Sequence, residues 1–182
     1  MKTFKAICLA AGLTSVASVA GAATYATSVD SYTPAGAVAA DRQNTANALG
    51  AKNGKFLSLG LGGEAILSFG TKFRGTATIW DVTYGNIANY KEEVEVYFGL
   101  NGVFTYAGNL LNSAAQGAGG IVSLAGIYDQ IKLVDVSPYK KGHDGFDIDS
   151  ISVEAVPLPA SGLLLVGAVA GVSALRRRKA KA

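Results

Sequence analysis

The sequence predicts an all-β protein, specifically an antiparallel, jelly-roll-like β-sandwich with a signal helix before it and a transmembrane helix after it. The main observation is that apolar residues recur at every second position in several short segments, which is the period of a strand with one buried face. Turns rich in Gly, Asn and Pro separate these segments at short intervals. Between residues 23 and 155 no stretch keeps the 3.6-residue period of a helix, so crossover helices are not expected.

The expected strands become regular after residue 55, where the alternation is clearest. Val94, Val96 and Phe98 illustrate it, because all three lie on one face of a strand. The earlier segment is rich in Ala, Ser, Thr and Asn, and residues 41–47 are predicted to form a loop or a single helical turn. The expected strands cover residues 25–29, 56–61, 65–69, 76–84, 93–98, 103–107, 121–124, 128–136 and 146–153.

Two local features of the strands can be predicted in more detail. Asn101-Gly102 is typical of a tight hairpin turn, because both residue types adopt positive φ at low cost. In the last expected strand, the alternation of apolar positions shifts by one residue between Ile148 and Ile151. This shift predicts a β-bulge at Asp149-Ser150.

The N-terminus has the three parts of a secretory leader. Two lysines precede an apolar run over residues 6–19, and Ala20 and Ala22 supply the small side chains of a signal peptidase site. We therefore predict a signal peptide over residues 1–22 that is cleaved after Ala22.

The C-terminus consists of an uncharged segment and a basic cluster. Apolar side chains favour the hydrocarbon of a membrane, whereas cations remain in water on its cytoplasmic side. Prolines cannot lie inside a regular helix, so the helix is expected over residues 162–175, about 21 Å at the helical rise. We predict a short transmembrane helix within a C-terminal segment of residues 156–182. The basic cluster that follows this helix consists of Arg176, Arg177, Arg178 and Lys179.

The first residues of that segment are Val156, Pro157, Leu158, Pro159 and Ala160. With the helix and the basic cluster, they resemble the VPLPA variant of the PEP-CTERM protein-sorting signals. The resemblance implies a tail that is held in the inner membrane of Gram-negative bacteria and cleaved at the proline-containing motif by the membrane enzyme exosortase. Signal peptidase and exosortase are then the expected processing partners, and the final location is the cell surface or the extracellular space. A permanent membrane anchor is the alternative.

Residues 23–155 form the expected secreted domain, which is acidic. The whole chain has a net charge of +3, but seven of its 16 cations lie in the two terminal segments. All 13 acids lie between these segments with nine cations, so the domain has a net charge of −4. This charge gives no support for nucleic-acid binding. The single cysteine, Cys8, lies in the leader, so the domain must be stabilised by its core and not by disulfides.

Several segments of the domain are similar to the β-sandwich ectodomains of exosortase-sorted proteins. Such ectodomains resemble discoidin-like and carbohydrate-binding jelly rolls, so the resemblance implies a fold and not an activity. The similar segments are residues 59–63, 65–70, 95–98, 102–108, 128–135 and 144–149.

Carboxylates near the last expected strand are candidates for a calcium site. Asp144, Asp147 and Asp149 lie close in sequence, and Ca²⁺ prefers oxygen ligands, but their spacing does not match an EF-hand loop. Because Asp147 and Asp149 alternate with apolar residues, we favour a solvent-exposed strand face. Asp129 and Asp135 are further candidates whose convergence depends on the fold. No cofactor is therefore expected, with calcium as the one possible exception.

Catalytic candidates are few. Glu92, Glu93 and Glu95 could supply the two carboxyls of a glycosidase, although a polar loop entering a strand explains them equally well. His143 has no second histidine or cysteine with which to share a metal ion, so an exposed turn position is expected for it. No serine lies in the Gly-x-Ser-x-Gly setting of a hydrolase nucleophile. We expect no catalysis.

Aromatic residues could stack on sugar rings if a row of them is exposed. For the single tryptophan a buried position is expected, since large aromatic side chains supply much of a core. The aromatic residues considered are Trp80, Tyr84, Tyr90, Tyr97, Tyr106 and Tyr139.

These observations favour an exported, exosortase-sorted surface or matrix protein whose β-sandwich has a structural or binding role. The alternatives are a carbohydrate-binding module for exopolysaccharide and, less favoured, a surface glycoside-active enzyme. Exposed coplanar aromatic rings would favour the module. Two convergent, partly buried carboxylates in a cleft would favour the enzyme.

Overall fold

The computed structural model describes residues 23–83, 90–112 and 119–156, and these residues form an antiparallel β-protein. Two short 3-10 turns, η1 (Ala40–Arg42) and η2 (Thr45–Ala48), lie between the second and third strands. The strands in the described ranges are β1 (Ala23–Tyr25), β2 (Ser28–Thr33), β3 (Leu57–Ser58), β4 (Glu64–Asp81), β5 (Glu93–Leu100), β6 (Val103–Leu111), β7 (Gly119–Asp135) and β8 (Asp147–Ala155).

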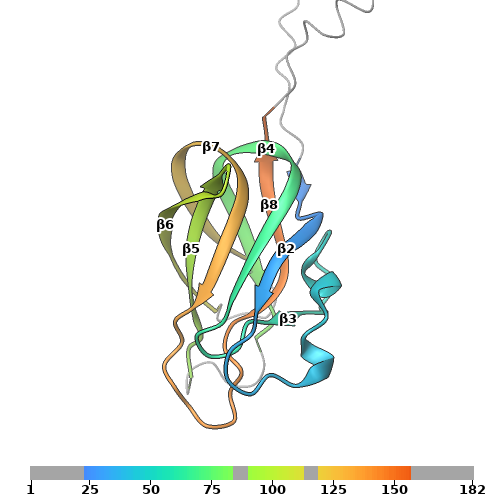
Figure 1. Cartoon of the computed structure of the whole chain (residues 1–182), viewed down its shortest axis with the longest axis vertical. Coiled ribbons are helices and arrows are strands. Elements are labelled where there is room, and N and C mark those ends of the chain that lie inside the picture. Colours follow the sequence, from blue (N-terminus) through green and yellow to red (C-terminus); the bar gives the residue numbers. More distant parts are fainter. Residues whose placement is uncertain (1–22, 84–89, 113–118, 157–182) are drawn as a thin grey trace, which may run out of the picture.

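Two long strands, β4 and β7, bend over one end of the molecule and belong to both layers of a sandwich (Figure 1). Their first paired stretch joins residues 64–68 to residues 130–134, and pairing resumes between residues 73–80 and 119–128 after a register shift. We call the layer of β2, β4 residues 64–68, β7 residues 130–135, β5 and β6 the front sheet. The back sheet contains the other halves of β4 and β7 with β8 and β1.

The core lies between the two sheets and follows the two-residue period of the strands. Val96, Phe98, Ile131 and Leu133 point inward from the front sheet and have no exposed surface. Phe73 of the back sheet packs edge-on against Phe98, with 5.8 Å between ring centroids. Alternation therefore predicts correctly which face of β5 and of the front half of β7 is buried.

The predicted hairpin and bulge are confirmed. Asn101 and Gly102 have φ values of 52° and 79° and join β5 to β6. Ser150 pairs with Trp80, whereas Ile148 pairs with the next β4 residue, so Asp149 is the extra residue of a bulge. The segment 41–47, predicted to be a loop or a single helical turn, instead carries parts of two short 3-10 turns, η1 and η2.

Several predicted strand boundaries are wrong. The strands expected at 65–69 and 76–84 are the single strand β4, and those at 121–124 and 128–136 are the single strand β7. Each of these strands bends where a turn was expected, so its hydrogen bonding to neighbouring strands continues in the other sheet. The strand expected at 25–29 is divided, because Ala26 donates to Ile151 of the back sheet and Thr27 to Ser68 of the front sheet. Only Leu57–Ser58 of the strand expected at 56–61 is paired.

The predicted terminal segments lie outside the described residues. These comprise the signal peptide with Ala20 and Ala22, the expected transmembrane helix, the basic cluster Arg176 to Lys179, and the sorting motif after Val156. Within residues 23–83, 90–112 and 119–156, no helix is long and apolar enough to cross a membrane. Ala23 pairs with Glu154, so both ends of the described sandwich lie together, at the top of Figure 1.

Candidate functional site

Polar side chains gather at both ends of the sandwich. At the end where β4 and β7 bend, a cleft of about 590 Å³ opens to solvent, and we call it the bend cleft. At the opposite end lie the carboxylates of the loops, and we call this region the acidic loop end. The bend cleft is lined by Ser68, Gly70, Thr71, Lys72, Asn101, Gly102, Asp129 and Gln130. The acidic loop end contains Asp81, Glu92, Asp135, Asp144 and Asp147.

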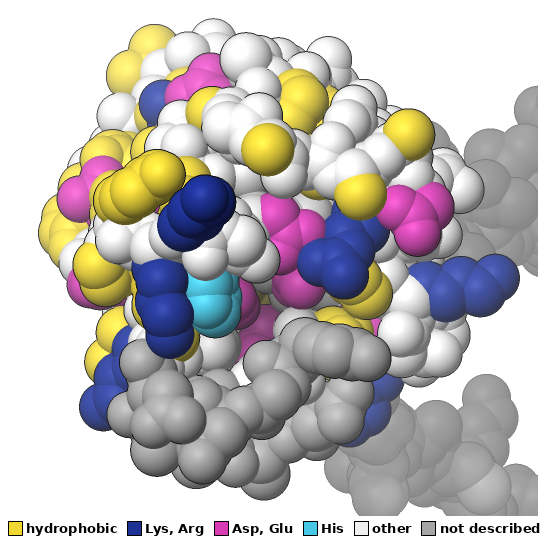
Figure 2. Space-filling view, turned by 90° about the horizontal axis from the view of Figure 1, so that it is seen from below, with side chains coloured by type: hydrophobic (Ala, Val, Ile, Leu, Met, Phe, Trp, Pro, Cys, Tyr) yellow, Lys and Arg dark blue, Asp and Glu magenta, His cyan; other side chains and the backbone are white. Residues whose placement is uncertain are grey.

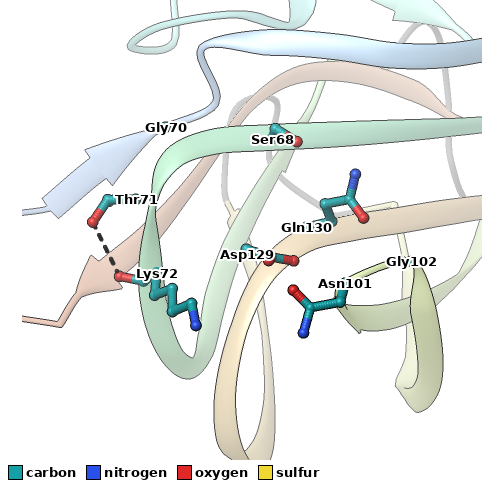
Figure 3. Close-up of a pocket in the computed structure, with 8 residues that line it drawn as sticks. All are labelled: Ser68, Gly70, Thr71, Lys72, Asn101, Gly102, Asp129 and Gln130. Atoms are coloured by element: carbon teal, nitrogen blue, oxygen red, sulfur yellow. Dashed lines mark hydrogen bonds between the residues drawn. The ribbon is translucent and has the colours of Figure 1, made fainter.

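The bend cleft combines three chain segments that are distant in sequence (Figure 3). Gly70, with φ of 66°, lies at the bend of β4, where a side chain would strain the backbone. Asn101 comes from the tip of the β5–β6 hairpin, and Asp129 comes from the bend of β7. Asn101 and Asp129 point toward each other, while Lys72 extends along the other side (Figure 3).

One wall of the bend cleft is fixed by the carboxylate of Asp30 on β2. Its Oδ1 accepts a hydrogen bond from Ser28 Oγ at 3.0 Å. Its Oδ2 accepts from Gln130 Nε2 at 2.8 Å and from Ser68 Oγ. Burial alone would raise the pKa of Asp30, but these three hydrogen bonds outweigh it and lower the pKa. Asp30 therefore stays charged and holds Ser68 and Gln130 in place.

One carboxylate oxygen of Asp129, in the bend cleft, lacks a hydrogen-bond donor among the described residues. Its Oδ1 is buried and accepts no hydrogen bond from any described residue. A buried acceptor of this kind is costly unless a ligand or water donates to it. Asp129 does not converge with Asp135, because the two residues lie at opposite ends of the front half of β7.

At the acidic loop end, Asp135 is a structural carboxylate. It is 2% exposed and accepts hydrogen bonds from the backbone N–H of Gly62 at 3.0 Å and of Phe146 at 2.8 Å. Its Oδ2 also accepts from Ser137 Oγ at 2.7 Å. These contacts join the end of β7 to the turn before β4 and to the loop between β7 and β8, so Asp135 holds this end of the sandwich together.

The solvent-exposed strand face predicted for Asp147 and Asp149 is wrong. Both residues are only 3% exposed. Asp147 pairs with Ser58 of β3, and the chain between η2 and β3 lies against β8, where Ser150 Oγ donates to the carbonyl of Gly50 at 2.6 Å. Asp149, at the bulge, accepts from the backbone N–H groups of Asn53 at 2.9 Å and Gly54 at 3.0 Å. Asp144 instead forms an ion pair with Arg42 at 2.6 Å.

Two carboxyls at this end, those of Asp147 and Glu92, have raised pKa values. Burial is the main cause that raises the pKa of Asp147 to about 7, and Asp144 adds to it. Burial likewise raises the pKa of Glu92 to about 8, with further contributions from neighbouring carboxylates, chiefly Asp147. Oδ1 of Asp147 is buried without a hydrogen-bond partner among the described residues. Within the described ranges no group of three or more His, Cys, Asp or Glu is arranged to hold a metal ion.

Glu92, Glu93 and Glu95 do not form one acidic site. Glu93 accepts from Asn109 Nδ2 at 2.6 Å, and Glu95 accepts from Tyr97 Oη at 2.5 Å, both on the outer face of the front sheet. Glu92 lies at the acidic loop end, where its closest acidic neighbours include the buried Asp147. A carboxyl that is 3% exposed cannot contact a glycosidic bond, so Glu92 and Asp147 are not placed as a catalytic pair.

His143 and Trp80 depart from expectation, since both are half-buried. The His143 ring packs on Tyr90, with 4.0 Å between centroids, and Figure 2 shows it beside basic and acidic side chains. Trp80 lies near Tyr25, at 6.3 Å. Tyr139 is 84% exposed.

A coplanar aromatic row is not formed by the described tyrosines. Tyr97 and Tyr106 are neighbours at 5.5 Å, but their planes differ by 68°. Tyr84 lies outside the described residues.

Most of the bend cleft could not be predicted from the sequence. Ser68, Lys72 and Gln130 carry no motif, and Asn101 is recognisable only as a turn residue. The one available signal is the interruption of the strand period at Gly70. It marks the position of the bend in β4 but does not show which other segments lie beside the bend.

No protein-family model and no curated protein matches this chain. Among solved structures, a pectin-binding carbohydrate-binding module is similar with a TM-score of 0.52 and 15% identity, over 72% of this chain and 95% of the module. A truncated AlyQ with CBM32 and alginate lyase domains is similar with a TM-score of 0.51 and 12% identity, over 76% of this chain and 35% of that protein. At these identities the likeness concerns the fold: the described chain is a β-sandwich of the kind found in carbohydrate-binding modules.

Proposed function

We propose that this chain is an exported, non-catalytic carbohydrate-binding protein of the cell surface or extracellular matrix, and that it binds sugar in the bend cleft. Its own exopolysaccharide is the proposed ligand. This choice moves the carbohydrate-binding alternative ahead of a purely structural role.

The proposal rests chiefly on the unpartnered, buried Oδ1 of Asp129 in the wall of a polar cleft. A sugar hydroxyl can donate to this oxygen once the groups that cover it move, and the new hydrogen bond would offset the cost of its burial. Lys72 offers only donors, whereas the amides of Asn101 and Gln130 can both donate and accept, as sugar hydroxyls require. A cleft of about 590 Å³ also lies within the usual size of small-ligand sites.

The fixed positions of two side chains in the wall of the bend cleft support the same proposal. Asp30 holds Ser68 and Gln130 in position before any ligand arrives. Positions fixed in advance reduce the entropy lost on binding. The likeness to a pectin-binding module adds support at the level of the fold only.

Export and sorting are proposed from the two terminal segments of the sequence. A leader cleaved after Ala22 by signal peptidase, and a tail with the VPLPA motif, would carry the domain through the inner membrane and to exosortase. The backbone N–H of Val156, the first motif residue, donates to the carbonyl of Lys72 at 2.9 Å. The tail therefore leaves the sandwich from the end that carries the bend cleft.

A direct test is a glycan-binding assay on the full chain in detergent micelles, with neutral and acidic bacterial polysaccharides as ligands. We expect Asp129→Ala to weaken binding by about tenfold or more, because an acceptor for a sugar hydroxyl is lost. Asp41→Ala, an exposed carboxylate away from the cleft, is the matched control. Thermal unfolding of each variant separates lost binding from lost folding. If the wild-type chain binds no polysaccharide, or if Asp129→Ala binds as well as wild type, the proposal is wrong.

Processing is tested separately, by the intact mass of the mature protein from the producing cell. We expect the loss of residues 1–22 and of everything beyond the Pro-Leu-Pro region. An intact C-terminus would instead support the permanent anchor.

The second candidate is a glycoside-active enzyme, which the raised pKa values of Glu92 and Asp147 favour. The 3% exposure of Asp147 argues against it. Release of reducing sugar that is abolished by Glu92→Gln would establish this candidate.

A further inference from the structure

We infer that the sugar-binding surface continues from the bend cleft across the outer face of the front sheet, and that this face takes a neutral polysaccharide chain. The inference rests on the proposed function and specifies its ligand. We call the added surface the outer strip. It consists of Gly99, Phe104, Tyr97, Lys132 and Tyr106.

Strand pairing makes the outer strip continuous with the bend cleft. Gln130 lines the cleft and pairs with Gly99 of β5, which in turn pairs with Phe104 of β6. Two residues along the strands, Lys132 pairs with Tyr97, which pairs with Tyr106. Residues two apart on a strand share a face, so these side chains lie in two adjacent rows on one surface.

Gly99 lies beneath the ring of Phe104 where the strip meets the cleft. A Cβ atom at this position would lie 2.5 Å from Cε1 of Phe104 and 3.2 Å from Cβ of Gln130. The Phe104 ring therefore packs directly over the Gly99 backbone. An apolar ring surface beside the amide of Gln130 suits a sugar, whose C–H face packs on rings and whose hydroxyls need polar partners.

The rings of the outer strip are held in place. Nζ of Lys132 lies 5.0 Å from the centroid of Tyr97 and 5.7 Å from that of Phe104. Tyr97 donates to Glu95 at 2.5 Å and Tyr106 donates to Asn109 at 2.5 Å. Tyr106 is 50% exposed. Fixed rings with exposed surface lose little entropy when a ligand packs on them.

The charge of this surface selects against acidic polymers. Two ammonium groups, of Lys72 and Lys132, face a larger set of carboxylates, and Lys132 already lies 3.7 Å from Glu64. A polymer with a carboxylate on each sugar would meet net repulsion here, whereas a neutral polymer would not. The carboxylates on this surface and in the cleft are Asp30, Glu64, Glu93, Glu95 and Asp129.

The test compares ligand length and ligand charge by calorimetry on the full chain in detergent micelles. The ligands are neutral glucan, galactan and mannan oligosaccharides of increasing length, their monosaccharides, and the uronic-acid polymers alginate and polygalacturonate. We expect affinity to rise with the length of a neutral oligosaccharide. Tyr106→Ala should weaken binding of the long ligand by about fivefold and leave monosaccharide binding unchanged. Tyr139→Ala, an exposed tyrosine at the acidic loop end, is the matched control.

The outcomes separate this inference from the proposed function. If Asp129→Ala abolishes binding but affinity is independent of length and of Tyr106, the cleft binds sugar and the outer strip does not. Tighter binding of alginate or polygalacturonate than of every neutral ligand would overturn the neutral-polymer inference alone. No binding of any ligand would overturn both. Tyr106→Phe keeps the ring, so it should retain the length dependence if stacking is responsible.

Discussion

At the acidic loop end, Asp135, Asp147 and Asp149 are at most 3% exposed. At the bend end, Asp129 lines a cleft that is open to solvent, and Asp30 bonds to two residues of its wall. The loop-end carboxylates accept hydrogen bonds from backbone N–H groups of segments distant in sequence, or have a pKa that burial raises. Those of the bend end orient other polar side chains or keep an unpartnered oxygen. The carboxylates at the loop end therefore stabilise the fold, and those at the bend end are the ones that we propose for ligand binding.

Asp135→Ala should have the largest effect on stability. It removes the acceptor of the buried N–H groups of Gly62 and Phe146, and such groups are costly when left unpaired. We expect the free energy of unfolding to fall by roughly 3 to 5 kcal/mol in urea titrations. Lys141→Ala, an exposed residue of the same end, should change it by less than about 0.5 kcal/mol. A small decrease in the free energy of unfolding for Asp135→Ala would contradict the structural role of this carboxylate.

The buried carboxyls should make stability depend on pH. Their folded-state pKa values, about 7 for Asp147 and about 8 for Glu92, lie above the ordinary values of 3.8 and 4.5. The folded state therefore binds protons more tightly than the unfolded state. The stability that these two protonated carboxyls contribute is fully present below about pH 4 and is lost as pH rises through 7 to 8. Asp147→Asn should flatten this dependence and raise the free energy of unfolding at pH 8.5 by about 2 to 4 kcal/mol. Urea titrations from pH 5 to pH 9 measure it.

A calcium titration at pH 8 serves as the control for that experiment. Asp144 and Asp149 already have Arg42 and backbone partners, so we expect the midpoint of thermal unfolding to stay unchanged when Ca²⁺ is added. A higher midpoint would mean that a cation, and not a proton, neutralises Asp147. Stability that increases between pH 5 and pH 9 would contradict the raised pKa values.

Gly70→Ala tests the bend that shapes the cleft. Since Gly70 has φ of 66°, we expect a loss of about 1 to 2 kcal/mol in the free energy of unfolding. Gly70→Asn should lose less, because asparagine tolerates positive φ better than alanine. Weaker sugar binding by the folded Gly70→Ala variant would link the bend to the cleft, and unchanged stability would show that the bend is not strained.

The smallest effect is expected for the ion pair of Arg42 and Asp144. Its side chains are 36% and 17% exposed, so solvent screens much of the attraction. A double-mutant cycle with Arg42→Met and Asp144→Asn should give a coupling of about 0.5 to 1 kcal/mol that decreases in high salt. Coupling above about 2 kcal/mol would place this pair with the structural carboxylates of the loop end.

Local sequence signals identified the elements better than their connections. The period of two predicted that Val96 and Phe98 are buried, and Asn101-Gly102 predicted the hairpin, because each signal depends on neighbouring residues only. The bulge at Asp149 was predicted for the same reason. The division of β4 into two strands was wrong, since a bent strand and a turn can both interrupt the period at a glycine such as Gly70.

The candidate site was much less predictable. Asp129 was considered only as a metal ligand. The residues that line the bend cleft with it come from β4, β7 and the β5–β6 hairpin, and Asp30 of β2 bonds to Gln130 in its wall. Asp147 and Asp149 were placed in solvent because alternation describes one covered face. It cannot show that another segment, here the chain before β3, covers the second face.

By itself the sequence determined that this protein is built from β-strands with alternating apolar residues. It also determined the position of the Asn101-Gly102 hairpin turn and the distribution of acids and cations along the chain. These properties follow from each residue and its immediate neighbours. Only the tertiary structure decided that β4 and β7 each serve two sheets and that Lys72, Asn101 and Asp129 meet at one end. The physical reason is that pairing register and burial depend on contacts between residues far apart in the chain, and no local pattern encodes which of them will meet.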